Sequence, residues 1–162
     1  MKKNSILYNE VLSFIYNKTK TPVDLDQNYP DSIFYASDSD GRSLLHHAVI
    51  HDALEFVKIL LSRNSDVNSV DKNGWTPLHY AVQNNSIKMA EILVDSGSDI
   101  DATDNNGNTV LWRATFASRG YGEVIDFLIN NGANPDTKNN NGISALELAN
   151  RIGNYDVKKY FK

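Results

Sequence analysis

Apolar residues recur along the chain at a nearly fixed spacing. A leucine followed three residues later by an alanine occurs as Leu45/Ala48, Leu78/Ala81, Leu111/Ala114 and Leu146/Ala149. The steps between these leucines are 33, 33 and 35 residues. Residues three apart lie on one face of a helix, and alanine lets a neighbouring helix approach closely. The pattern therefore predicts a series of short helices packed side by side.

A second apolar stripe follows each of the first three helices and predicts a second helix per unit. Its members are Val57, Leu60 and Leu61, then Ala90, Leu93 and Val94, then Ile125, Leu128 and Ile129. Each first helix is preceded by a hydroxyl residue suited to an N-cap, namely Ser43, Thr76, Thr109 and Ser144. Pro77 supports the start of one of these helices, because its missing N–H has no helical partner there.

Glycines mark the ends and turns of each unit. Gly97 and Gly132, with Asn64 as a tolerable substitute, stand where a helix ends in a left-handed residue. A second set is predicted to form the turn between units: Gly41, Gly74, Gly107 and Gly142. One such unit cannot bury its apolar face alone, so the units are expected to stack into a solenoid.

The stretch DKNGWTPLHYAV at 71–82 opens the part of the chain, 71–101, that best matches the ankyrin-repeat signature D-x-x-G-x-T-P-L-H-x-A…L-L-x-x-G-A-x-x-N. The chain resembles this family closely over 38–162 and poorly over the first 37 residues. The resemblance implies antiparallel helix pairs with a hairpin-like finger between repeats. We expect one domain, 1–162, with an all-α repeat-solenoid fold. Its expected parts are an N-terminal cap at 1–37 and ankyrin repeats at 38–70, 71–103, 104–138 and 139–162, the last of them capping.

The two ends depart from the repeat. Residues 5–18 predict one amphipathic helix that covers the first repeat, whereas Pro22 and Pro30 argue against a second helix over 19–31. SIFYAS, at 32–37, aligns with the finger position. The last residues, NYDVKKYFK, predict a short final helix that packs Val157, Tyr160 and Phe161 inward.

Composition narrows the function classes. The chain has no cysteine, which excludes disulfides, a thiol nucleophile and Cys-ligated metal. Its formal net charge of −4 argues against generic nucleic-acid binding. No signal-peptide core and no long apolar run is present, so we expect a cytoplasmic protein that does not enter the membrane and is monomeric when free.

The histidines are the main candidates for chemistry. His46 and His79 occupy the motif histidine, for which the family resemblance implies a structural role. His47 and His51 have the i, i+4 spacing of metal ligands, but no glutamate lies between them and no third ligand is evident. We expect them to be exposed on a contact face instead. Phosphate-loop and nucleophile-elbow motifs are absent, so we predict no metal, no cofactor and no enzymatic activity.

The residue after the finger glycine varies most between repeats: Arg42, Trp75, Asn108 and Ile143. The resemblance places this position on the concave surface of the fingers. Such variation within one protein is unexpected for a core position, and Trp and Arg dominate binding hot spots. A contact role is therefore predicted for Trp75, with the alternative that it merely lies over the neighbouring finger.

The two extra residues of the third repeat lie between Thr115 and Tyr121. Insertions in a solenoid map to loops, often on the binding face. Phe116 could anchor a partner there or fold back under Trp112. The complete set of predicted partner-binding residues is Arg42, His47, Ile50, His51, Lys72, Trp75, Tyr80, Gln83, Asn84, Asn108, Arg113, Phe116, Arg119 and Tyr121.

The predicted function is binding alone. We expect a non-enzymatic module that grips one protein partner on its concave face and inhibits it by occlusion. The chain resembles small bacterial ankyrin proteins, some of which are immunity proteins that block a toxin. Its acidic charge suits a basic toxin or enzyme. The alternatives are a secreted effector or adaptor that binds host proteins, and a metalloprotein or enzyme that uses His47 and His51.

Overall fold

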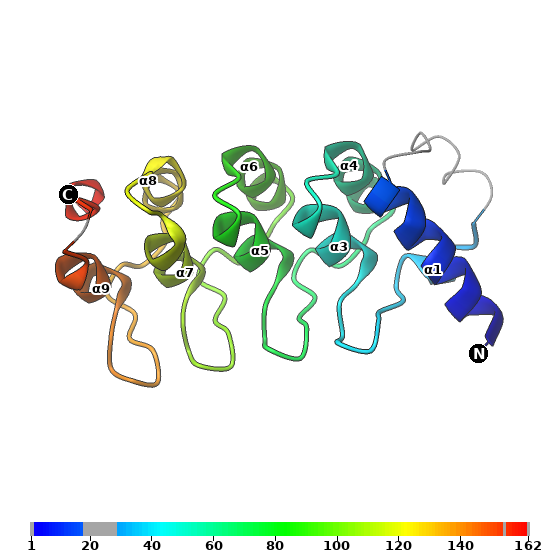
Figure 1. The fold of residues 1–162 in the computed structure, drawn as a ribbon, viewed down its shortest axis with the longest axis horizontal. Coiled ribbons are helices and arrows are strands. Elements are labelled where there is room, and N and C mark those ends of the chain that lie inside the picture. Colours follow the sequence, from blue (N-terminus) through cyan, green and yellow to red (C-terminus); the bar gives the residue numbers. More distant parts are fainter. Residues whose placement is uncertain (1, 18–28, 154, 162) are drawn as a thin grey trace.

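The computed structural model describes residues 2–17, 29–153 and 155–161, which form one row of stacked helix pairs (Figure 1). Helix α1, Lys2–Asn17, lies at one end. A first row contains α3 (Leu44–Ile50), α5 (Pro77–Gln83), α7 (Val110–Ala117) and α9 (Ala145–Arg151). A second row contains α4 (Leu54–Ser62), α6 (Ile87–Asp95) and α8 (Glu123–Asn130). Short 3-10 helices η1 (Asp31–Ile33) and η2 (Lys158–Tyr160) complete the described elements.

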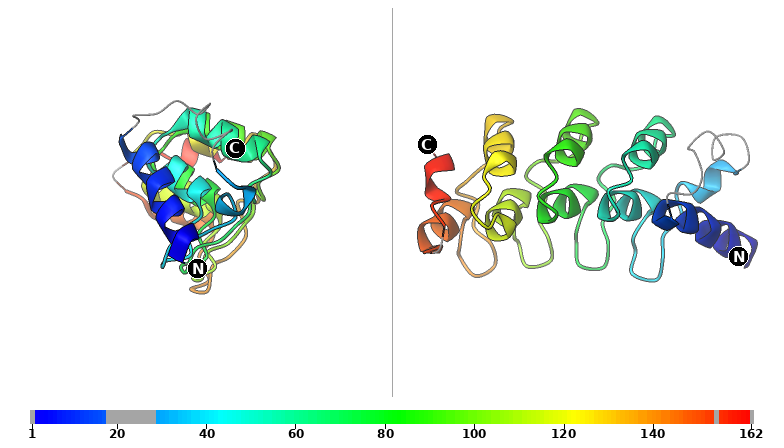
Figure 2. Two further views of the ribbon diagram at one scale, coloured as in Figure 1. Left: turned by 90° about the vertical axis from the view of Figure 1, so that its right-hand side faces the viewer. Right: turned by 45° about the horizontal axis from the view of Figure 1, so that its top comes forward.

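The loops between helix pairs form fingers that all project to one side of the row (Figure 2). Each finger contains a five-residue turn closed by a backbone hydrogen bond from its first residue to its last, as in Asp71 N to Trp75 O at 3.0 Å. We call these the finger turns: 38–42, 71–75, 104–108 and 139–143. Neighbouring turns are also bonded to each other, as in Asn105 N to Asn73 O at 3.0 Å. A Cβ on Gly74, at φ +76°, would lie 2.8 Å from the Asn105 nitrogen, so this close stacking requires glycine.

The predicted hydroxyl residues cap the first-row helices. The side chains of Ser43, Thr76, Thr109 and Ser144 each accept a hydrogen bond from the backbone N–H three residues later. His46, His79 and Glu147 return a bond to the cap backbone and complete a capping box. Trp112 replaces the histidine in α7 and cannot accept such a bond, so that cap is one-sided.

The core contains the leucines and alanines that recur in each repeat. Leu45, Leu78 and Leu111 are fully buried, because each lies between helices of two adjacent repeats. Leu146 is only half-buried, since no further first-row helix follows α9 in the described part of the chain. Gly97 and Gly132 end α6 and α8 at φ +90° and +93°, and Asn64 does the same after α4 at φ +57°, as predicted.

Both ends of the described chain pack against the stack of repeats. Helix α1 packs on the first repeat through buried Val11 and Ile15, which confirms its capping position. The prediction for 19–31 falls mostly on 18–28, outside the described residues. The predicted short final helix is present as the 3-10 helix η2. Val157 is fully buried, as predicted, and the Tyr160 ring lies against Gly122, where a Cβ would stand.

Candidate partner-binding surface

The predicted contact residues separate into two groups that lie at opposite ends of the first-row helices. Each of these helices begins at a finger and ends at the loop to its second-row partner. We call the contact between one finger turn and the next repeat a joint. Five predicted residues lie at joints: Arg42, Trp75, Tyr80, Asn108 and Arg113. His47 lies between the first finger turn and α1. Five others lie around a groove at the far end: Gln83, Asn84, Phe116, Arg119 and Tyr121.

Within each of the first three repeats, a side chain on the first helix bonds to the aspartate that starts the finger turn nine residues earlier. His47 Nε2 lies 2.9 Å from Asp38 Oδ2. The Tyr80 hydroxyl donates to Asp71 Oδ2 at 2.7 Å. Arg113 Nη2 donates to Asp104 Oδ2 at 2.6 Å. Three different chemistries thus serve one purpose, which is to hold the finger turn against its own helix.

Across each joint, the residue that ends one finger turn reaches the next repeat. Arg42 Nε donates to the Tyr80 hydroxyl at 3.2 Å and lies 3.8 Å from Asp71 Oδ2. The Arg113 guanidinium lies over the Trp75 ring, 4.6 Å from its centroid. The joints are therefore continuous chains of polar and aromatic contacts between repeats.

The third joint follows the same plan with amides. Asn139 Nδ2 donates to Asn108 Oδ1 at 2.6 Å, and Asn108 Nδ2 donates to Asp104 Oδ2 at 3.0 Å. Both asparagines are buried. Because each amide offers a donor and an acceptor, the pair satisfies itself without solvent.

The finger aspartates are held ionised by this network. Burial alone would raise the pKa of Asp104, but hydrogen bonds from Arg113, from the Asn108 side chain and from two backbone N–H groups outweigh it and lower the pKa. Asp71 behaves in the same way, with Tyr80 as the side-chain donor. Burial and the hydrogen bond to Asp71 raise the pKa of Tyr80 to about 12, which keeps it a donor. The charges at the joints are therefore internally compensated.

Two predicted contact residues are buried, contrary to expectation. His47 is buried, not exposed, because α1 covers it and the Tyr16 hydroxyl lies 3.0 Å from its Nδ1. Asn108 is buried as well. Trp75 is half-buried and packs against Tyr80 of its own repeat and the Arg113 guanidinium of α7 in the next repeat, so its ring lies against helices and not over the neighbouring finger. The contact role given to Trp75 stays a prediction.

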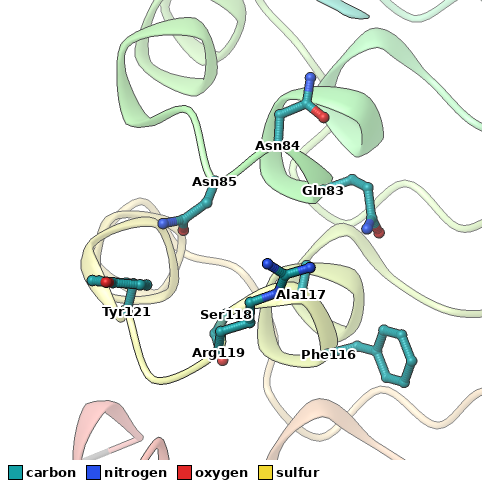
Figure 3. Close-up of a pocket in the computed structure, with 8 residues that line it drawn as sticks. All are labelled: Gln83, Asn84, Asn85, Phe116, Ala117, Ser118, Arg119 and Tyr121. Carbon is teal, nitrogen blue, oxygen red and sulfur yellow. The ribbon is translucent and has the colours of Figure 1, made fainter.

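The groove lies between the end of α5 and the loop from α7 to α8 (Figure 3). Its volume is about 380 Å³. One wall is formed by Gln83–Asn85 and the other by the segment from Phe116 to Arg119 together with Tyr121. The groove thus brings the inserted residues of the third repeat against the corresponding helix end of the second, two segments that the sequence does not connect locally.

Exposed aromatic rings border the groove. Phe116 stacks on Trp112, with ring centroids 5.5 Å apart and planes 11° from parallel, yet it remains 59% exposed. Phe116 thus lies against Trp112, as in the second alternative given for it, and its role as an anchor for a partner stays a prediction. Tyr121 is 69% exposed. Large apolar rings left exposed beside a concave surface are typical of interaction sites.

Arg119 has an unusual backbone conformation in the groove wall. Its φ is +47°, in the left-handed region, which costs a side-chain-bearing residue about 1–2 kcal/mol. Asp52 and Asn85 occupy the corresponding loop positions at φ +51° and +52°, and these residue types tolerate the region. Strain of this kind gathers at functional sites. The position therefore supports a role for Arg119 outside stability.

The other predicted contact residues lie apart from both groups. Ile50 is half-buried, and its carbonyl accepts a bond from Asn84 Nδ2 at 3.3 Å. His51 is exposed and lies against the Tyr16 ring, with centroids 4.4 Å apart. Lys72 is exposed on a finger, where its backbone bonds both neighbouring fingers. Sequence reasoning missed Asn85, Ala117 and Ser118 in the groove wall, although they adjoin residues that it identified.

Two further classes of site were sought in the described residues. No group of three or more His, Asp or Glu side chains there could hold a metal ion. The spacing of His47 and His51 is instead explained by contacts to Tyr16 and Asp38. No helix in the same part of the chain is both long and apolar enough to cross a membrane.

Comparison with known proteins gives two family matches. A family model described as ankyrin repeats (3 copies) matches residues 8–104, more than half of the chain. A second, described as ankyrin repeats (many copies), matches residues 85–129. No curated protein matches the chain.

Proposed function

Because the chain belongs to the ankyrin-repeat family, a family of protein–protein interaction modules, we propose that it binds one partner protein through the groove beside α5 and α7 and inhibits that partner by occlusion. The observation that carries this proposal is the exposure of Phe116 and Tyr121 around the groove. Burying two aromatic rings supplies much of the free energy of a protein interface.

The joints support the proposal by making the surface rigid. Backbone bonds between fingers and side-chain bonds between repeats hold the helix ends in a fixed relation. A partner then meets a preformed groove and little conformational entropy is lost on binding. Rigid presentation favours simple occlusion of a partner's own site, as in the small bacterial immunity proteins that the chain resembles.

The overall charge favours a partner with a basic surface. The formal net charge is −4, and complementary charge speeds association and helps to exclude wrong partners. Basic toxins and nucleic-acid enzymes carry such surfaces. In this proposal the chain contributes no catalytic chemistry, and its effect on the partner follows from coverage alone.

The test is affinity capture from native lysate with a tagged protein and two matched variants. The first variant is Phe116→Ala/Tyr121→Ala, which removes both groove rings. The control is Tyr35→Ala, which removes a ring that is 64% exposed near the N-terminal end of the row. We expect one stoichiometric partner with the wild type and the control, and its loss with the groove variant.

An activity assay of the captured partner then distinguishes an inhibitor from an adaptor. Its activity, assayed with and without stoichiometric amounts of this protein, should fall in the complex if occlusion is the mechanism. Full activity in the complex would indicate an adaptor, and equal capture by all three baits would contradict binding at the groove.

A further inference from the structure

The groove carries a charge opposite to that of the chain. The formal net charge of the protein is −4, but the groove is lined by one cation, Arg119, and no carboxylate. The two arginines at the joints are paired: Arg42 with Tyr80 and Asp71, and Arg113 with Asp104. Among the described residues, Arg119 has no hydrogen-bond or ion-pair partner. The Arg119 guanidinium is exposed beside the groove and is therefore available to pair with a carboxylate of another molecule.

The direction of Arg119 puts its charge inside the groove. Figure 3 shows the guanidinium reaching from the α7–α8 loop toward the end of α5, where Gln83 and Asn84 lie. The planar guanidinium matches a carboxylate with two parallel hydrogen bonds.

We propose that the groove binds an extended acidic segment of the partner, with a carboxylate side chain on Arg119 and a neighbouring apolar side chain on the Phe116 ring. This inference rests on the proposed function and names the partner's chemistry at that site. Even a partner with a basic overall surface would contribute one acidic segment here. The stacked Trp112 ring fixes the Phe116 platform, so an apolar side chain gains contact area without having to order the ring.

The opposite wall suits a peptide backbone. Gln83 and Asn84 are exposed amides, each with donor and acceptor atoms. Asn84 Nδ2 bonds the Ile50 carbonyl at the end of α3 at 3.3 Å, which turns its amide toward the first repeat, so Gln83 is the exposed amide of this wall that faces the Arg119 side of the groove (Figure 3). An extended chain presents one N–H and one C=O per residue, and amide side chains can match both. A volume of about 380 Å³ admits the side chains of a short segment and not a folded element.

Selection from a random peptide library tests the chemistry directly. Twelve-residue peptides displayed on phage would be selected on the immobilised wild-type protein, and the enriched sequences synthesised with a fluorescent label. We expect enrichment of Asp or Glu next to an apolar residue. Fluorescence anisotropy should then show at least tenfold weaker binding when the acidic residue is replaced by lysine.

Charge reversal in the protein completes the test. Arg119→Glu should weaken binding of the acidic peptides at least tenfold and reverse the preference, so that the lysine peptides bind better. Lys58→Glu is the control, because it changes the net charge equally at an exposed position of α4. It should leave peptide affinity within about twofold of the wild type.

The outcomes also separate this inference from the proposed function. The inference is overturned if no peptide is enriched, if enriched peptides lack an acidic residue, or if Arg119→Glu binds them as the wild type does. It is also overturned if the wild type forms a dimer that Arg119→Glu abolishes, since the occupant is then a second copy. Should the captured partner still depend on Phe116 and Tyr121 in those cases, the proposed function stands alone; if nothing depends on the groove, both fail.

Discussion

The joints and the groove contain similar residue types, but their side chains are partnered differently. At the joints, each varied side chain bonds a varied side chain of the next repeat, as Arg42 does with Tyr80 and Trp75 with Arg113. In the groove, the exposed rings and Arg119 find no such partner among the described residues. Substitutions at the joints should therefore cost stability, and substitutions in the groove should cost binding.

The largest effect is expected from removing a buried charge at a joint. Asp104 has a fully buried side chain and accepts bonds from Arg113, from the Asn108 amide and from two backbone N–H groups. Asp104→Ala leaves Arg113 uncompensated and these donors unpaired. We expect a loss of about 3–5 kcal/mol in the free energy of unfolding, measured by urea denaturation. Asp136→Ala, at an exposed finger position, is the control and should change stability by less than about 0.5 kcal/mol.

The second largest effect is expected from acid, which should lower the free energy of unfolding through the buried histidines. Burial lowers the pKa of His79 to about 4, and it also lowers the pKa of His46 and His47. The folded state then binds fewer protons than the unfolded state, whose histidines titrate near pH 6.5, so stability falls as the pH drops through 6.5 and continues to fall toward 4. For His79 alone the loss between pH 8 and pH 5 is about 2 kcal/mol.

The pH measurement has an internal control. Between pH 6.5 and 5 the finger aspartates stay ionised, because their pKa values are lowered. Urea denaturation at pH 8 and pH 5 therefore reports the histidines. His79→Gln keeps an acceptor for the cap and should flatten the pH dependence while lowering stability at pH 8. A wild-type protein equally stable at both pH values would show that these histidines are not held neutral.

A pair of aromatic substitutions compares the two regions directly. Trp75→Ala removes ring contacts with Tyr80 and with Arg113 of the next repeat, and should cost about 1–2 kcal/mol of stability. Phe116→Ala removes a ring that is 59% exposed and should cost about 0.5 kcal/mol or less. Capture of the partner should show the reverse order. Equal stability of the two variants would contradict the assignment of Trp75 to a joint.

The repeat architecture could be predicted from the sequence because it depends on local rules. The leucine column marks the buried face, the hydroxyl residues cap the helices, and Gly97 and Asn64 end them. These signals act within a few residues and recur from repeat to repeat. The apolar pattern of the last segment likewise predicted its short helix, which forms as η2.

The joints could not be predicted by the same reasoning, because each pairing connects residues more than 30 positions apart, as in Arg42 with Tyr80 and Asn108 with Asn139. A signal was present, however. The first joint pairs Arg42 with Tyr80. At the same two positions of the second joint the residue types are exchanged, with Trp75 in place of the arginine and Arg113 in place of the tyrosine, so each pair keeps one cation and one aromatic ring. Comparing these two positions as a pair across the repeats would have assigned Trp75 to a joint and not to the groove. The groove itself was indicated by the inserted residues of the third repeat.

The substitution with the smallest expected effect separates the groove from the joints most clearly, because stability and partner binding should change in opposite directions. Arg119→Asn places a residue that tolerates φ +47° in the groove wall, and should raise the free energy of unfolding by about 0.5–1 kcal/mol. Asp52→Arg is the mirror substitution at φ +51° in the loop of the first repeat and should lower it by a similar amount.

Partner capture by Arg119→Asn should fall even though the protein is more stable. If replacing Arg119 raises the free energy of unfolding, the arginine lowers the stability of the free protein. A binding role for its guanidinium would explain why an arginine stands there. If Arg119→Asn raises stability and leaves capture unchanged, the strain has no functional reason and Phe116 and Tyr121 alone carry the groove. If it lowers stability instead, Arg119 belongs with the joints, as a residue that the fold itself requires.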